Sequence, residues 1–204
     1  MIVLGLTGSI GMGKSTATAM LRGMGIPVHC SDEAVHQLLD PCGEAIRVVA
    51  AAFPESYDKR RQAINRAALG RLAFSQPEKR VRLESILHPL VVQSQRRFLA
   101  RNAQCRRPLV VLDIPLLFET GAERRVDYTL VVTAPAFIQR MRVLTRPGMT
   151  PEKFAGILAS QMPDHEKRRR ADFVIDTGLG LAHTRKALRV VLDRVRLHEQ
   201  TGEG

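Results

Sequence analysis

The 204-residue sequence contains no tryptophan, and aromatic residues make up only 4% of it. Proteins that bind single-stranded nucleic acid without sequence preference stack the bases on aromatic side chains. So few aromatic residues argue against a stacking surface of that kind. Long apolar runs are also absent, and none approaches the roughly 20 residues that a membrane-spanning helix needs. We therefore expect no membrane association.

Cysteine is scarce as well. The three cysteines, Cys30, Cys42 and Cys105, are odd in number and lack the spacing of a metal site. This usage predicts free thiols in a reducing compartment. The first residues, Met1 to Leu4, lack the basic flank of a signal peptide and lead directly into the loop described below. We expect a cytoplasmic protein.

Acidic residues are outnumbered by basic ones, 20 to 31, which gives a net charge of +11. Such a charge fits either a nucleic-acid-binding protein or an enzyme with anionic substrates. The basic residues occur as short scattered clusters, such as Lys59–Arg61 and Lys167–Arg170. Each cluster taken alone favours a solvated surface over a binding site.

A phosphate-binding loop lies near the N-terminus. Residues 8–15, Gly-Ser-Ile-Gly-Met-Gly-Lys-Ser, fit the pattern G-x-x-x-x-G-K-S/T. The apolar run Ile2–Leu6 before it predicts a buried strand, and Thr16–Met24 after it predicts a helix that Gly25 ends. The order strand, loop, helix is the context that this motif requires.

The residue types in the loop suit the binding of a polyphosphate. Glycine permits the backbone conformations that turn consecutive N–H groups toward an anion, and the N-terminus of the following helix adds free donors. Lys14 can reach the outer phosphates, and the Ser15 hydroxyl can ligate Mg²⁺. The predicted nucleotide-binding residues of this segment are Gly8, Gly11, Met12, Gly13, Lys14, Ser15 and Thr16.

Strands and helices are predicted to alternate along most of the chain. Beyond the first strand, the apolar segments 26–30, 109–113, 128–132 and 173–175 predict four more. Alternation of this kind implies an α/β fold, with a five-stranded, mostly parallel sheet and helices on both faces. The last helix should dock on the sheet through Leu181, Leu188, Val191, Leu192 and Val195.

Residues 44–107 interrupt this alternation, because they predict helices and no strong strand. We interpret residues 41–107 as a helical lobe inserted into a single 1–204 domain whose core is 1–40 and 108–204. A long helix should follow Pro77, and Pro89 should kink or break it. Its predicted buried stripe consists of Val81, Leu87, Leu90, Val91 and Phe98.

Two carboxylates follow predicted strands. Asp32 comes just after the second strand, behind Ser31, which we expect to be a helix N-cap. The carboxyl end of a strand is where ligands bind in open α/β sheets, although Asp32 could simply pair with a helix dipole. Asp113 ends the apolar run Leu109–Leu112, as expected of the carboxylate that a central strand delivers to the Mg²⁺ side of a phosphate-loop site.

Residues 140–170 are predicted to form a lid. Helices are expected over 136–146, over 151–161 with Thr150 as the cap, and over 164–170. Arg140 and Arg146 lie in or at the end of the first of these helices. In phosphate-loop kinases, arginines that close over the nucleotide neutralise the charge that develops on the transferred phosphoryl group. The alternative for Arg140 and Arg146 is that they lie on solvated helix faces.

Taken together, these segments resemble the dephospho-coenzyme A kinase family, nearly from end to end. The resemblance rests on the phosphate loop and on further stretches along the chain, of which the His-Pro pair, the Pro-Leu-Leu-Phe-Glu stretch and the Ala-Asp…Ile-Asp strand are the most specific in combination. The further stretches are Ser31-Asp32, Asn65-Arg66 with Leu69, Leu87-His88-Pro89, Asp113-Ile114-Pro115-Leu116-Leu117-Phe118-Glu119, Gln139-Arg140, Arg146, Gln161 and Ala171-Asp172-Phe173-Val174-Ile175-Asp176.

The resemblance implies a P-loop kinase fold with an inserted acceptor lobe and a lid. It implies that ATP, with Mg²⁺, phosphorylates the 3′-hydroxyl of dephospho-coenzyme A to give coenzyme A and ADP. Arg66 and His88 would belong to the acceptor side, with a purely structural role as the alternative. Leu116 and Leu117 belong either to the core or to a substrate wall, and the sequence does not separate the two. The catalytic residues would then be Lys14, Asp32 and Arg140. Arg146 would help to hold the nucleotide.

The sequence departs from the family pattern in two places. Cys30-Ser31-Asp32 keeps only the last carboxylate of the Asp-Ala-Asp that the family often has, and Thr177 stands where an asparagine is usual. Other readings of the chain are another small-molecule or nucleotide kinase and a basic nucleic-acid-binding ATPase. Because no aromatic platform or recognition motif is evident, we expect no nucleic-acid partner, and a monomer or small homo-oligomer.

Overall fold

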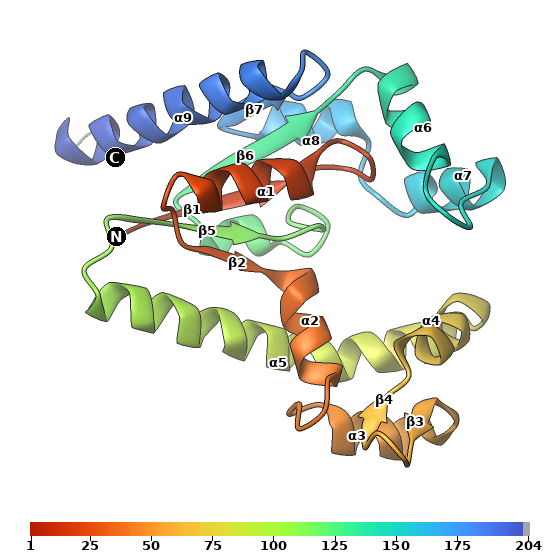
Figure 1. The fold of residues 1–204 in the computed structure, drawn as a ribbon. Coiled ribbons are helices and arrows are strands. Elements are labelled where there is room, and N and C mark those ends of the chain that lie inside the picture. Colours follow the sequence, from red (N-terminus) through yellow and green to blue (C-terminus); the bar gives the residue numbers. More distant parts are fainter. Residues whose placement is uncertain (202–204) are drawn as a thin grey trace. The chain divides into compact units, whose positions relative to one another are not determined.

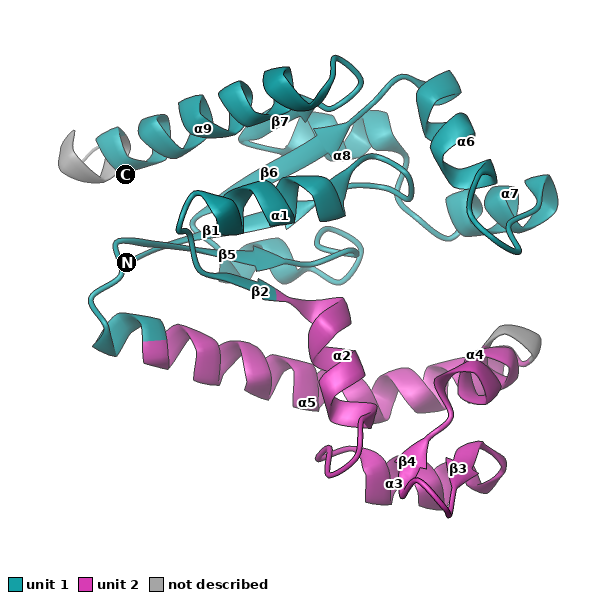
Figure 2. Ribbon diagram, in the orientation of Figure 1, with its two compact units in different colours: residues 1–29, 102–204 teal, residues 30–101 magenta. Residues whose placement is uncertain are grey.

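The structure is a computed structural model that describes residues 1–201, with only the backbone described for residues 74, 75 and 198–201. It divides into two compact units, Met1–His29 with Asn102–Gly204, and Cys30–Arg101 (Figure 2). The first unit contains the phosphate loop. The second unit begins at Cys30 and not at residue 41, because the helix that follows Cys30 packs into the second unit's core.

A five-stranded sheet runs through the first unit (Figure 1). Its strands are β1 (Ile2–Thr7), β2 (Val28–Cys30), β5 (Leu109–Asp113), β6 (Tyr128–Thr133) and β7 (Phe173–Asp176), in the order β2-β5-β1-β6-β7. The strand β1 pairs in parallel with both β5 and β6, and β6 pairs in parallel with β7. All five predicted strands are therefore present, within two residues at each end.

Helices cover the sheet. On one face of the sheet, α1 (Lys14–Gly23) packs against α9 (Leu181–Thr201). In the view of Figure 1, α8 (Asp164–Arg170) lies behind the sheet, where it packs against β6. Between β6 and α8 lie α6 (Ala136–Leu144) and α7 (Pro151–Ala159), and a short 3₁₀ helix η2 (Ala122–Arg125) precedes β6. Thr150 caps α7 as predicted, because its side chain accepts the Lys153 N–H.

The core of the first unit forms where the apolar strands meet the inner stripes of α1 and α9. Leu4, Leu6, Val111 and Leu130 are buried there. The last helix buries Leu188, Val191, Leu192 and Val195 as predicted, but Leu181 at its first position is 68% exposed. The prediction that Leu181 is buried is therefore wrong. Helical spacing alone did not show that α9 begins at this residue.

The second unit is helical with one small hairpin. It contains α2 (Ser31–Leu39), α3 (Ile46–Ala52), the 3₁₀ helix η1 (Pro54–Ser56), α4 (Arg66–Ser75) and most of α5 (Pro77–Gln104). Two-residue strands, β3 (Tyr57–Asp58) and β4 (Ala63–Ile64), pair antiparallel. The sequence predicted no strong strand here, and strands of two residues are too short to show an alternating pattern.

Two local predictions for this unit are wrong, and a third is wrong in part. Ser31 is the first helical residue and not the N-cap, which is Cys30. Of the kink or break expected at Pro89, the break does not occur, because α5 runs from Pro77 to Gln104. Val81 is 65% exposed, because the packed stripe of α5 consists of Leu83, Ile86, Leu87, Leu90 and Val91. Leu87, Leu90 and Val91 were predicted to lie in this stripe, whereas Leu83 and Ile86 occupy it in place of Val81.

None of the helices, searched over the described residues, is both long and apolar enough to cross a membrane.

Candidate active site

The predicted phosphate loop joins β1 to α1 as the motif requires. The first intrahelical hydrogen bond described for α1 runs from Ala17 N–H to Gly13 C=O, so the N–H groups of residues 14–16 belong to the open first turn. Ser15 and Thr16 are exposed there. A helix N-terminus that presents free N–H groups and a partial positive charge attracts phosphate.

Two glycines of the loop are required by its geometry. A Cβ at Gly8 would lie 2.7 Å from the Val132 carbonyl oxygen, so β6 permits no side chain at that position. Gly13 has φ +86°, a left-handed conformation that strains any other residue, and it forms the N-cap of α1. The side chain of Met12 between them is buried in the core, so only its backbone can face a ligand.

Lys14 and Asp113 are brought together. The Lys14 Nζ lies 2.5 Å from Asp113 Oδ1, and Asp113 is 1% exposed. The register of the sheet produces this pair, because Asp113 lies opposite Leu6 on β1, just before the loop. The carboxylate predicted from the end of an apolar strand therefore lies beside the lysine of the loop.

Thr18 completes this cluster and was not among the predicted site residues. Its hydroxyl donates to Asp113 Oδ2 at 2.7 Å, so each carboxylate oxygen has one partner from α1. Lys14 and Thr18 are four residues apart on one helix, which places them on the same face. The four-residue spacing from Lys14 was the feature of the sequence that could have indicated Thr18, because both side chains then face the same carboxylate.

An arginine on α6, Arg142, supports the loop from the other side and was not among the predicted site residues. Arg142 donates to the Thr177 hydroxyl and carbonyl, both at 2.9 Å, and the Thr177 hydroxyl donates to Met12 C=O. Arg140 and Arg146 are exposed. Thr177, the departure from the family pattern, therefore holds the loop through its hydroxyl.

The donor set fits a magnesium ion that is held mainly by a ligand's phosphates. Among the described residues, no group of three or more His, Cys, Asp or Glu side chains is placed to hold a metal. Mg²⁺ usually takes only one or two protein ligands and completes its shell with phosphate oxygens and water. Ser15, exposed at the start of α1, and Asp113 supply oxygens of the right kind.

Three predicted acceptor residues belong to the second unit. Asp32 is exposed in the first turn of α2, Arg66 begins α4 and lies 3.7 Å from Asp40, and His88 is exposed on α5. In the first unit, Leu116 is half-buried, but Leu117 is fully buried beside Gly5. Leu117 therefore presents no side-chain surface for a substrate, because β1 covers it.

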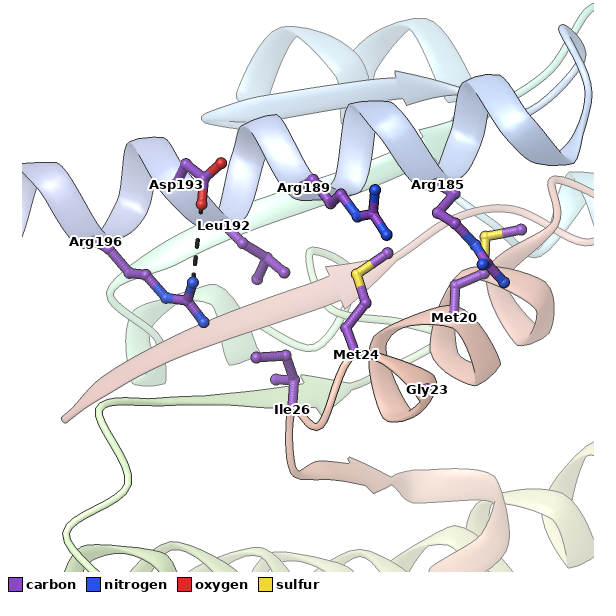
Figure 3. Close-up of a pocket in the computed structure, with 9 residues that line it drawn as sticks. All are labelled: Met20, Gly23, Met24, Ile26, Arg185, Arg189, Leu192, Asp193 and Arg196. Atoms are coloured by element: carbon purple, nitrogen blue, oxygen red, sulfur yellow. Dashed lines mark ion pairs between the residues drawn. The ribbon is translucent and has the colours of Figure 1, made fainter.

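Two hollows lie in the first unit. One of about 480 Å³ lies beside the loop, with Met12, Thr133, Gln139, Asp164 and Arg168 among its lining residues. The other, of about 370 Å³, lies between the C-terminal half of α1 and α9, where Arg185, Arg189 and Arg196 surround Met20 and Met24 (Figure 3). The second hollow is at the opposite end of α1 from the phosphate loop, so it is not part of the site described above.

Comparisons with known proteins identify the family of the chain. The family model for dephospho-CoA kinase matches residues 2–182. The dephospho-CoA kinase of Mesorhizobium japonicum is 54% identical over 96% of this chain and 98% of its own length, and that of Rhizobium meliloti is 50% identical over 96% and 99%. A crystal structure from Thermus thermophilus superposes with a TM-score of 0.78 at 38% identity, covering 95% of this chain and 97% of the other.

Proposed function

The chain belongs to the dephospho-CoA kinase family, which catalyses the ATP-dependent phosphorylation of dephospho-CoA, and from this premise we propose how its residues divide the reaction. The observation that carries the proposal is the cluster of Lys14, Asp113 and Thr18 below the open first turn of α1. The backbone N–H groups of residues 13–16 hold the ATP phosphates, and Lys14 contacts the outer ones.

The chemical step is a displacement at the γ-phosphorus. A bond forms between that phosphorus and the 3′-oxygen of the ribose, the bond to the oxygen bridging the β- and γ-phosphates breaks, and ADP leaves. Phosphoryl transfer asks the protein mainly for positioning and charge stabilisation. Lys14 and Arg140 supply positive charge in this proposal, with Arg146 as a weaker candidate.

Asp32 acts on the acceptor. Its exposed carboxylate orients the ribose hydroxyl or takes its proton during the transfer. It is the one acidic side chain in the Cys30-Ser31-Asp32 stretch where the family often has two. Arg66, His88 and Leu116 bind other parts of dephospho-CoA. The side chain of Leu117 is left out of this set because it is buried.

Ser15 and Asp113 are the protein groups that would hold an Mg²⁺ ion bound together with ATP. When bound, the ion neutralises phosphate charge and polarises the transferred group. The protein's own contribution is to keep the two oxygen ligands on rigid elements, the start of α1 and the end of β5. Activity as a function of Mg²⁺ concentration tests the assignment, since Ser15→Ala should raise the concentration needed for half-maximal rate and Ser85→Ala, on α5, should not.

An acceptor panel tests the function as a whole. We expect ADP release from ATP to depend on dephospho-CoA and to be far slower with AMP, adenosine or no acceptor. Equal turnover of AMP would favour a nucleotide kinase. Salt-dependent RNA or DNA binding that stimulates ADP release without dephospho-CoA turnover would favour the basic ATPase. We further propose a monomer or small homo-oligomer in the cytoplasm, which mass measurement in solution and cell fractionation test.

A further inference from the structure

Ile10, in the middle of the phosphate loop, has both of its backbone polar groups bonded to side-chain amides. Its N–H donates to Gln161 Oε1 at 3.1 Å, and its carbonyl accepts from Gln139 Nε2 at 2.8 Å. Gln139 is on α6, and Gln161 follows α7, 129 and 151 residues away from Ile10 in the sequence. The two glutamines therefore join the loop to both ends of the α6–α7 segment.

The polarity of these hydrogen bonds fixes how each amide is oriented. A backbone N–H can only donate and a backbone carbonyl can only accept, so Gln161 must present its oxygen and Gln139 its NH₂ group. Gln139 is 6% exposed, and Gln161 is half-buried. Water therefore competes little for the Gln139 amide and more for the Gln161 amide, and losing either bond removes the protein partner of a backbone group.

Gln161 is itself held in place by a neighbouring buried contact. The N–H of Met162, the next residue, donates to Glu119 Oε1 at 2.9 Å, and Lys167 Nζ lies 2.8 Å from the same oxygen. Lys167 is 0% exposed, and its contact with Glu119 is ionic without a well-aligned hydrogen bond. Arg170 adds a second tie from α8 through Glu123. The backbone at residue 162 is therefore fixed to the loop after β5.

We propose that Gln139 and Gln161 are positioning residues that hold the Ile10 peptide groups in one conformation, so that the N–H groups that follow point at the ATP phosphates. Neither glutamine is assigned to contact the nucleotide. A loop that is already ordered loses less conformational entropy when ATP binds. The kinetic part of this inference rests on the proposed ATP site, whereas the structural part does not.

The donor and acceptor roles give a matched pair of variants. Glutamate has the shape of glutamine and two acceptor oxygens but no donor at neutral pH. Gln161→Glu keeps the acceptor for Ile10 N–H, whereas Gln139→Glu removes the donor for Ile10 C=O. Both variants add one carboxylate beside the loop, and because the Gln139 side chain is the more buried of the two, the uncharged Gln161→Met variant separates the hydrogen bond from the charge. Gln161→Met removes the acceptor without adding charge, and Gln93→Glu, exposed on α5, is the remote control.

Amide hydrogen exchange of the full-length protein, without added nucleotide, tests the contacts directly. We expect exchange at Ile10 to be about threefold to tenfold faster in Gln161→Met, the range for one hydrogen bond of modest strength. In Gln161→Glu it should stay within about twofold of wild type. Unchanged exchange at Ile10 in Gln161→Met would overturn the proposal, whatever the protein does with ATP.

Steady-state kinetics test the consequence for binding. Gln161→Met and Gln139→Glu should each raise the KM for ATP about threefold to tenfold, with the KM for dephospho-CoA unchanged and Gln161→Glu closer to wild type than Gln139→Glu. A purely structural role would lower the active fraction, and hence kcat, with both KM values unchanged, and that pattern would also overturn the proposal. Urea unfolding of each variant identifies any that fails to fold, and the remaining glutamine variant then decides.

Discussion

The ammonium group of Lys14 lies 2.5 Å from the carboxylate of Asp113, so the cation assigned to the ATP phosphates already has an anionic partner within the protein. Asp113 is almost fully buried, whereas the Lys14 side chain is 13% exposed. The lysine can therefore turn toward phosphate while the carboxylate stays in place. Thr18 keeps one oxygen of Asp113 bonded during such a movement.

Replacing Lys14 by methionine should lower kcat/KM about 100-fold or more, because one preorganised charged donor is worth on the order of 3 kcal/mol in a transition state. The assay is coupled ADP release with dephospho-CoA as the acceptor. Lys186→Met, at an exposed position on α9, is the control and should keep its activity. A Lys14 variant with near-wild-type turnover would contradict the role given to this residue.

Asp32→Asn should lower kcat by more than it raises the KM for ATP, since the carboxylate acts on the acceptor and not on the nucleotide. Initial rates measured at saturating concentrations of each substrate in turn separate the two effects. Glu33→Gln is the matched control, because it removes the same charge from the same exposed helical turn. If the Asp32 variant turned over normally once saturated with ATP, the carboxylate would have no part in the transfer.

Thr18→Val should destabilise the fold by about 1–2 kcal/mol, because it keeps the shape of the side chain but leaves the buried Asp113 Oδ2 without its donor. Urea unfolding measures the change. Thr120→Val is the control, since its exposed hydroxyl bonds only the carbonyl of Leu116 four residues earlier, and it should cost less than about 0.5 kcal/mol. Equal free energies of unfolding for the Thr18 variant and wild type would show that this hydrogen bond makes no net contribution to stability.

Thr150→Ala should unwind the start of α7 at a cost of about 1 kcal/mol, because its side chain is the N-cap. The same side chain also lowers the pKa of the Glu152 carboxyl by hydrogen bonding. Because the pKa is depressed in the folded state, this contribution to stability is present above the carboxyl's ordinary pKa and is lost as the pH falls through the depressed value. An NMR titration should show a higher Glu152 pKa in Thr150→Ala than in wild type. An unchanged pKa would show that the Thr150 hydroxyl does not lower the Glu152 pKa.

The strongly patterned parts of the fold were predictable from the sequence. Five apolar runs gave the five strands, and the glycine spacing in residues 8–15 gave the loop. Asp113 lies beside Lys14, at the end of a central strand as expected, and its role toward Mg²⁺ stays a prediction. In the second unit, by contrast, the hairpin of β3 and β4 was missed, and Val81 was wrongly placed in the stripe of α5, although Leu87, Leu90 and Val91 were placed correctly. Two-residue strands carry no periodicity, and Pro89 was expected to kink or break α5, which continues through it without a break.

The support of the loop was harder to foresee than the loop itself. Gln139, Arg142, Gln161 and Thr177 all reach the loop from segments more than 120 residues away. Their spacing along the chain reflects helix lengths in α6 and α7 and not their common target. Arg142 was not considered, since only Arg140 and Arg146 were predicted to close over the nucleotide, and the structure shows that Arg142 contacts the loop through Thr177.

A crystal structure with a non-hydrolysable ATP analogue and Mg²⁺ tests the central claim most directly. The account predicts the β- and γ-phosphates within hydrogen-bonding distance of the backbone N–H groups of residues 13–16, with the Lys14 ammonium turned toward the outer phosphate. Phosphates bound elsewhere in the molecule, with the first turn of α1 untouched, would contradict it.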